Sequence, residues 1–226
     1  MLRFWKRFLD PIDVLAESIY SVLILMTFTM AVRIFDTDIA ARPYFAQSWV
    51  HSLFVAALGC AIAWGFIDAV IYILTSLAER SQARRFVRSI ETADNHAQAV
   101  AHVAEMLDSR IGEVTTEAER ARLAVSVVKN LAGYHPAETW VKRDDITGAL
   151  ALFSVAIAST LPVVLPLLLV RDPFVALRVS NLVSVAYLYL IGYWWGKYAG
   201  TKPVRAGLMV ALTGTILVIV AIPLGG

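Results

Sequence analysis

The stretch GCAIAWGFIDAVIYIL, residues 59–74, is apolar, small or aromatic at every position except Asp68. Hydrophobic residues make up 58% of the 226-residue chain and charged residues only 17%, against about a quarter in soluble domains. The hydrophobic residues gather in blocks, which is typical of a membrane protein. A carboxylate inside such a block is costly, so we expect Asp68 to have a partner or a function.

Five segments are long and apolar enough to cross a hydrocarbon core, which takes about 20 helical residues. The first opens with Asp10 and Pro11, an N-cap residue followed by proline at the first helical position. The second contains Asp68. We therefore predict an all-α membrane protein whose first two transmembrane helices lie in residues 1–77 and whose other three lie in residues 146–226. The predicted spans are about residues 11–32, 53–77, 146–170, 174–198 and 204–224.

Residues 78–145 are rich in Glu, Arg, Ala and Asp and contain no apolar run of spanning length. ERSQARRFVRSIETA, residues 79–93, is expected to continue the second spanning helix beyond the membrane. In NHAQAVAHVAEMLDSRI, residues 95–111, apolar residues recur at helical spacing, which predicts an amphipathic helix. Its expected inward positions are Ala99, Val103, Met106 or Leu107, and Ile111.

TTEAERARLAVSVVKNLAGY, residues 115–134, predicts a further helix, with Thr115 or Thr116 as the N-cap and Gly133 as the C-cap. Residues 78–145 are therefore interpreted as a helical insert of two or three helices between the second and third spans.

Lysine and arginine are distributed unevenly about the predicted spans. With five spans, the N-terminus and the insert share one side, and that side holds sixteen Lys and Arg residues against four elsewhere. The positive-inside rule then predicts a cytoplasmic N-terminus, a cytosolic insert and a C-terminus outside.

Glu17 is a second carboxylate within a predicted span, on a helix face with Asp13, and Asp68 shares its face with Trp64 and Tyr72. Two carboxylates on adjacent helices could bind a divalent cation, because oxygen ligands suit hard cations, and they could also carry protons. Both carboxylates could instead have a purely structural role. Asp68 could bond to Tyr72 or to a hydroxyl on another span, and Glu17 could pair with an arginine near the interface.

Other polar or helix-breaking residues of the spans are candidates for a pathway or for packing. Pro162 and Pro166 free backbone carbonyls within the third span, and Asn181 could bond across helices in the fourth. Trp64 and Tyr72 belong to the same group because they flank Asp68.

In the insert, His102, Glu105 and Asp108 follow at three-residue steps on one helix face and form a weaker set of candidate metal ligands. A solvated helix surface is the simpler interpretation. The sequence contains no CxxC, HExxH, Gly-rich phosphate loop or nucleophile elbow, so we do not expect an enzyme. The net charge of +2 does not suggest nucleic acid as a partner.

Two spans, a helical insert and three more spans resemble the vacuolar iron transporter family, including its bacterial members. The residues that carry this resemblance are the double proline of STLPVVLPLLLV, residues 159–170, and the RAGL and TG of the fifth span, at 205–208 and 213–214. The resemblance implies a homodimeric, proton-coupled exporter of ferrous iron and related divalent metals such as manganese, in the bacterial inner membrane, with no tightly bound cofactor.

By position, the resemblance makes Glu17 in LAESIYS the acid of the first span and Asp68 in WGFIDAVIY the acid of the second. The family usually has Asp followed by Gly at the first position and Glu at the second. Trp64 replaces a methionine common one turn before the second acid. The family insert carries repeated glutamates, whereas ERSQARRFVRS is basic.

Two hypotheses follow. In the first, the chain transports divalent cations such as Fe²⁺ or Mn²⁺ through Glu17 and Asp68. In the second, it is a non-transporting membrane scaffold on the same fold. Its buried acids are then structural, and its basic insert binds a protein or anionic lipid.

Overall fold

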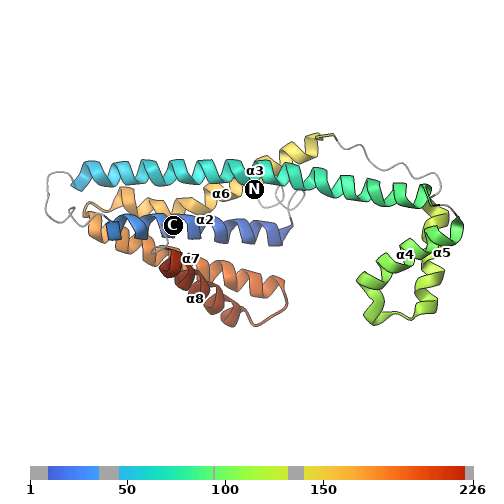
Figure 1. Ribbon diagram of the computed structural model, residues 1–226. Helices are drawn as coiled ribbons and strands as arrows, with labels where there is room; N and C mark the ends of the chain where they lie inside the picture. The colour runs from blue at the N-terminus through green and yellow to red at the C-terminus, as the bar shows by residue number, and fades with distance from the viewer. Residues whose placement is uncertain (1–9, 36–45, 94, 132–139, 222–226) are drawn as a thin grey trace. The chain divides into compact units, whose positions relative to one another are not determined.

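The computed structural model describes residues 10–35, 46–93, 95–131 and 140–221. Within these residues the chain forms seven α-helices and one short 3-10 turn, Gly112–Val114, without a strand (Figure 1). The α-helices are α2 (Pro11–Phe35), α3 (Ala46–Glu91), α4 (His96–Ile111), α5 (Glu117–Leu131), α6 (Arg143–Leu169), α7 (Pro173–Tyr198) and α8 (Pro203–Ala221).

Five of these helices, α2, α3, α6, α7 and α8, are long and apolar enough to cross a membrane. They coincide in number and order with the five predicted spans. The largest difference in length is at α3, which continues without a break past the predicted end of its span to Glu91. This confirms that most of residues 79–93 continue the second spanning helix. α6 runs as one helix through both Pro162 and Pro166.

Two helix starts follow from local capping. The Oδ1 of Asp10 accepts a hydrogen bond from the backbone N–H of Ile12 at 2.9 Å, which confirms Asp10 and Pro11 as the start of α2. At α7, the Oδ1 of Asp172 accepts from the N–H of Val175 at 2.9 Å, again directly before a proline. Both caps satisfy backbone donors that the helices leave unpaired.

The chain divides into two compact units, residues 1–72 with 143–226, and residues 73–142. In the first unit, which we call the bundle, α2 packs against α6, α7 and α8 (Figure 1). Its largest apolar core joins residues of these four helices and one residue of α3: Val22, Leu25, Met26, Ala57, Val163, Val164, Leu188, Ile191, Ala211 and Val218.

α7 and α8 form a closely packed hairpin. A Cβ added to Gly192 on α7 would lie 2.7 Å from the Cβ of Val210 on α8, which is too close for any side chain. Gly196, one turn later, is equally close to Ala206. Small residues at four-residue spacing therefore let the two backbones approach, as is common between membrane helices.

α3 is the least buried of the five apolar helices. Its buried positions in the bundle form one narrow stripe along the helix: Val50, Leu53, Ala57, Ala61 and Gly65. Asp68 and Tyr72, both half-buried, continue this stripe at the same three- and four-residue spacing. Asp68 therefore lies on the side of α3 that faces the other helices of the bundle.

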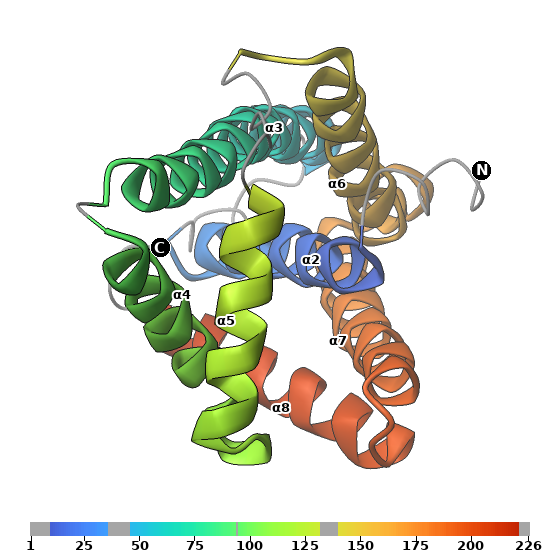
Figure 2. The same ribbon diagram turned by 90° about the vertical axis from the view of Figure 1, so that its right-hand side faces the viewer.

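The second unit contains the last turns of α3 with α4 and α5, and we call it the insert unit. α4 and α5 lie side by side (Figure 2). The core confirms Ala99 and Val103 as inward positions of α4, and it includes Leu107, whereas Met106 is exposed. Its other members are Phe86, Ile90, Ala93, Val100, Ala104, Ala124, Val127, Val128 and Leu131.

The start of α5 is a capping box built on Thr116. The hydroxyl and the backbone N–H of Thr116 each donate to the Oε2 of Glu119 at 2.8 Å, and the N–H of Glu119 donates to the Thr116 hydroxyl at 3.4 Å. Thr116 rather than Thr115 is thus the N-cap. The predicted C-cap, Gly133, lies outside the described residues.

Candidate functional site

Glu17 is buried on α2, with only 6% of the residue exposed. The hydroxyl of Ser21, one turn later, donates to Oε1 of Glu17 at 3.3 Å. Ser18, the next residue, donates its hydroxyl proton to the carbonyl of Val14 at 2.8 Å and accepts from the hydroxyl of Ser159 on α6 at 2.9 Å. Ser21 is therefore the hydroxyl partner of Glu17, while Ser18 beside it joins α2 to α6.

The carboxyl group of Asp68 on α3 is hydrogen-bonded to the carboxyl group of Glu17 on α2. An ionised carboxylate can only accept hydrogen bonds, so a bond between two carboxyl groups requires a proton on one of them. The two acids can therefore hold one proton between them across two helices. Glu17 is buried, whereas Asp68 is half-buried and so retains an accessible side.

Two close approaches between α3 and α6 flank Asp68. A Cβ added to Gly65, one turn before Asp68, would lie 3.1 Å from atoms of Phe153 and Ala156 on α6. One turn after Asp68, the ring of Tyr72 lies over Gly148, whose added Cβ would lie 2.5 Å from the tyrosine hydroxyl oxygen. Glycine at 65 and 148 makes room for side chains of the facing helix, Phe153 at the first position and Tyr72 at the second.

This arrangement offers oxygen atoms as ligands, from two carboxyl groups and the nearby hydroxyl of Ser21. Such ligands suit hard divalent cations, which also keep part of their water shell when they bind to few protein groups. Within the described part of the chain, no three His, Cys, Asp or Glu side chains form a group that could hold a metal ion. A cation at this site would therefore use the acid pair with hydroxyl and water oxygens.

The weaker candidate ligands have surroundings of their own. Asp13 lies one turn before Glu17 on α2 but is exposed. In the insert unit, His102 and Glu105 are exposed on α4, and Oδ1 of Asp108 forms an ion pair of 2.9 Å with Arg120. Arg120 also donates to the carbonyls of Gly112 and Thr115, so Asp108 helps to hold the turn between α4 and α5.

The residues predicted to line a pathway or to pack between helices differ from one another in burial and in contacts. Oδ1 of Asn181 accepts a hydrogen bond from the hydroxyl of Thr29 at 3.0 Å, which joins α7 to α2 inside the bundle. Pro166 is buried and Pro162 half-buried on α6, while Trp64 on α3 is 45% exposed.

Sequence reasoning missed the link between Ser18 and Ser159 and the role of Thr29. Ser18 is next to the candidate residue Glu17, but nothing in the sequence spacing identifies Ser159 as its hydrogen-bond partner.

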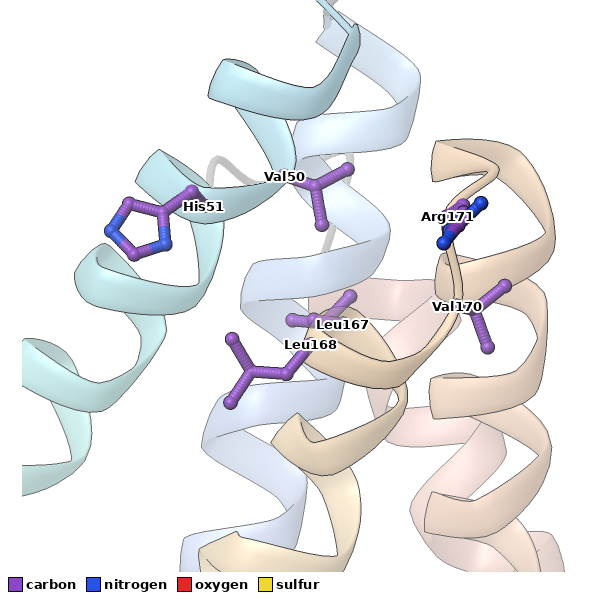
Figure 3. A pocket seen from close by; sticks show the side chains of 6 residues that line it. All are labelled: Val50, His51, Leu167, Leu168, Val170 and Arg171. Carbon is purple, nitrogen blue, oxygen red and sulfur yellow. The ribbon is translucent and has the colours of Figure 1, made fainter.

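A separate pocket of about 160 Å³ lies near the first turns of α3 and the end of α6 (Figure 3). Val50, at its wall, precedes Asp68 by about five helical turns, so this pocket is not part of the acid pair. Its walls are mostly aliphatic, and its two basic residues, His51 and Arg171, are both exposed. In the view of Figure 3 these two side chains stand apart, with Leu167 and Leu168 between them.

No family model matches the sequence, and comparison with curated proteins gives no match. The vacuolar iron transporter resemblance therefore rests on the order of the spans and on the quoted residues alone.

Proposed function

We propose that this chain is a proton-coupled transporter of divalent metal cations, of the vacuolar iron transporter type. Glu17 and Asp68 are its ion-binding residues, and Fe²⁺ or Mn²⁺ is the transported substrate. The observation that carries this proposal is the hydrogen bond between the two carboxyl groups on separate apolar helices. Ionisable residues in such helices are rare and generally belong to substrate or proton paths.

In the proposed cycle, the shared proton and the metal ion compete for the same oxygens. With one proton between them, Glu17 and Asp68 bond to each other and together carry a single negative charge. A divalent cation that reaches the half-buried side of Asp68 attracts both groups in ionised form, and the proton leaves. When a proton returns, the carboxyl groups bond to each other again and release the ion. Ser21 keeps Glu17 oriented during the exchange through its hydrogen bond.

The orientation and the assembly are also part of this proposal. The bias of Lys and Arg puts the N-terminus and the insert unit on the cytoplasmic side of a bacterial inner membrane. A homodimer through α3 is supported by the outer face of that helix, where Phe66 is 65% exposed and Leu74 59% exposed. A second copy there would cover part of this outer face, and lipid would cover the remaining apolar surface.

The test is uptake of Mn²⁺ and Fe²⁺ into proteoliposomes under an imposed proton gradient, in both directions. We expect the unmodified protein to move the ion and Asp68→Asn to lose at least nine-tenths of the flux. Asp144→Asn is the matched control, because Asp144 is an exposed carboxylate in the first turn of α6. Folded Asp68→Asn protein with unchanged flux would overturn the assignment of the site.

The alternative is a membrane scaffold in which the acid pair is purely structural. It is favoured by the same hydrogen bond, because the bond already gives each buried carboxyl group a partner without an ion. In that case no ion moves under either gradient, and Asp68→Asn changes only stability or assembly.

A further inference from the structure

The last turns of α3 have two chemically opposite faces. Phe86 and Ile90 pack into the core of the insert unit with α4 and α5, and Val87 is buried beside them. The opposite face carries Arg80, Arg84 and Arg88 at four-residue steps, with Arg85 next to them. At 100° per residue, these four positions cover about 140° of the helix circumference. We call them the arginine face.

Three residues of the arginine face are available to a ligand. Arg84, Arg85 and Arg88 are exposed, and within the described part of the chain none of the three forms an ion pair or a hydrogen bond. By contrast, Arg120 of the same unit is engaged by Asp108 and by backbone carbonyls. Arg84, Arg85 and Arg88 therefore carry unneutralised guanidinium groups, which bind phosphate in a planar, bidentate geometry.

The position of this face along the chain indicates its ligand. α3 is unbroken from Ala46 to Glu91, and Arg80 follows Leu77, the predicted end of the span, by three residues. Clusters of Lys and Arg directly after a membrane helix lie near the lipid headgroups, where anionic lipids attract each charge by about 1 kcal/mol. One helix supplies both the span and the arginines, and Arg84 follows Leu77 by seven residues, about 10 Å along the helix axis, which is within reach of the headgroup layer.

We propose that Arg84, Arg85 and Arg88 bind the phosphate groups of anionic phospholipids in the membrane that α3 spans. The apolar face of the same turns is covered by α4 and α5, so lipid binding would fix the orientation of the insert unit relative to the bilayer surface. This inference does not depend on metal transport, because none of these residues belongs to the acid pair.

The test is native mass spectrometry of the full-length protein in a non-ionic detergent, with phosphatidylglycerol or phosphatidylcholine added at equal concentration. The unmodified protein is expected to retain phosphatidylglycerol in preference to phosphatidylcholine. In the triple variant Arg84→Gln, Arg85→Gln and Arg88→Gln, phosphatidylglycerol affinity should fall about five-fold per arginine, on the order of 100-fold in total. Circular dichroism and gel filtration check that this variant is folded.

The matched control removes three positive charges elsewhere in the same unit, through Arg110→Gln, Arg122→Gln and Lys129→Gln. All three residues are exposed on α4 or α5. This variant should keep the preference for phosphatidylglycerol. The proposal is overturned if the unmodified protein does not prefer phosphatidylglycerol, if the triple variant keeps the preference, or if the control loses it equally.

Two further measurements separate lipid from other anionic ligands. Inorganic phosphate at matched ionic strength should not displace phosphatidylglycerol, and displacement with the same arginine dependence would point to a free anion instead. Binding of an acidic protein through the arginine face, by a chain with no lipid preference, would likewise contradict the lipid assignment.

Discussion

The carboxyl groups of Glu17 on α2 and Asp68 on α3 are hydrogen-bonded to each other inside the apolar bundle. Neither group is thus left as an isolated charge, which would be costly in such surroundings. The same bond makes the pair sensitive to anything that removes its proton. A divalent cation is the simplest such agent, and this connects the packing of two helices to the proposed transport.

The pair should contribute to stability as a unit. Replacing Asp68 with alanine leaves the buried Glu17 carboxyl with Ser21 as its hydrogen-bond partner, and we expect a loss of about 1–3 kcal/mol in the free energy of unfolding. The double variant Glu17→Ala with Asp68→Ala should cost clearly less than the sum of the single variants, because the second change removes a group already without its partner. Thermal unfolding in detergent measures this coupling. Strict additivity would show that the two groups do not interact.

The bond between Thr29 and Asn181 gives a second stability prediction. Thr29→Val keeps the shape of the side chain but removes the hydroxyl that donates to Asn181, so it should cost about 0.6 kcal/mol and at most about 2. Thr27→Val is the matched control, because the Thr27 hydroxyl bonds only within its own helix, to the carbonyl of Leu23. Equal unfolding temperatures for the two variants would contradict the interhelical role of Thr29.

The hairpin of α7 and α8 predicts opposite effects for the same substitution at two glycines. Gly192→Ala places a Cβ 2.7 Å from Val210 and 2.9 Å from the carbonyl oxygen of Ala206, so it should destabilise the bundle. Gly59→Ala meets nothing within 4 Å on α3 and should stabilise its helix by up to about 1 kcal/mol. The measurement is the unfolding temperature of both variants, and a stabilised Gly192→Ala variant would contradict the close packing.

The capping box of α5 predicts a pH dependence. The backbone N–H and then the hydroxyl of Thr116 hold the pKa of the Glu119 carboxyl below its usual range. A carboxyl whose pKa is lower in the folded state stabilises that state fully above its unfolded pKa of about 4.3. This contribution is lost as the pH falls through the lower pKa of the folded protein.

Hydrogen exchange of the amides in the first turn of α5 measures this effect. Protection relative to Glu119→Gln should decline as the pH is lowered from about 6 to 3, because glutamine does not titrate. Glu117→Gln is the control, since Glu117 is an exposed acid of the same turn. An unchanged ratio between the unmodified protein and Glu119→Gln across this range would argue against the depressed pKa.

Features set by local sequence could be predicted, and features set by packing could not. The five apolar helices follow from segment length, and the cap at Asp10 follows from the residue types next to Pro11. The N-cap of α5 could have been fixed as Thr116, because Glu119 stands three residues after it and completes a capping-box pattern.

The contact between Glu17 and Asp68 could not be predicted from the spacing of residues in the sequence. Each residue is placed on a face of its own helix by periodicity, but the rotation and axial position of α3 depend on its contacts with α6 at Gly65 and Tyr72. The sequence left open whether Asp68 bonds to Tyr72, to a hydroxyl or to another acid. The choice of Leu107 over Met106 likewise depends on how α4 and α5 are rotated against each other.

The most direct test of the central claim is the number of protons released when Mn²⁺ binds to the purified protein in a weakly buffered detergent solution. If the shared proton of Glu17 and Asp68 is exchanged for the cation, the unmodified protein should release about one proton per ion bound. The double variant Glu17→Gln with Asp68→Asn should neither bind the ion nor release a proton. Binding without proton release, or equal binding by the double variant, would contradict the account.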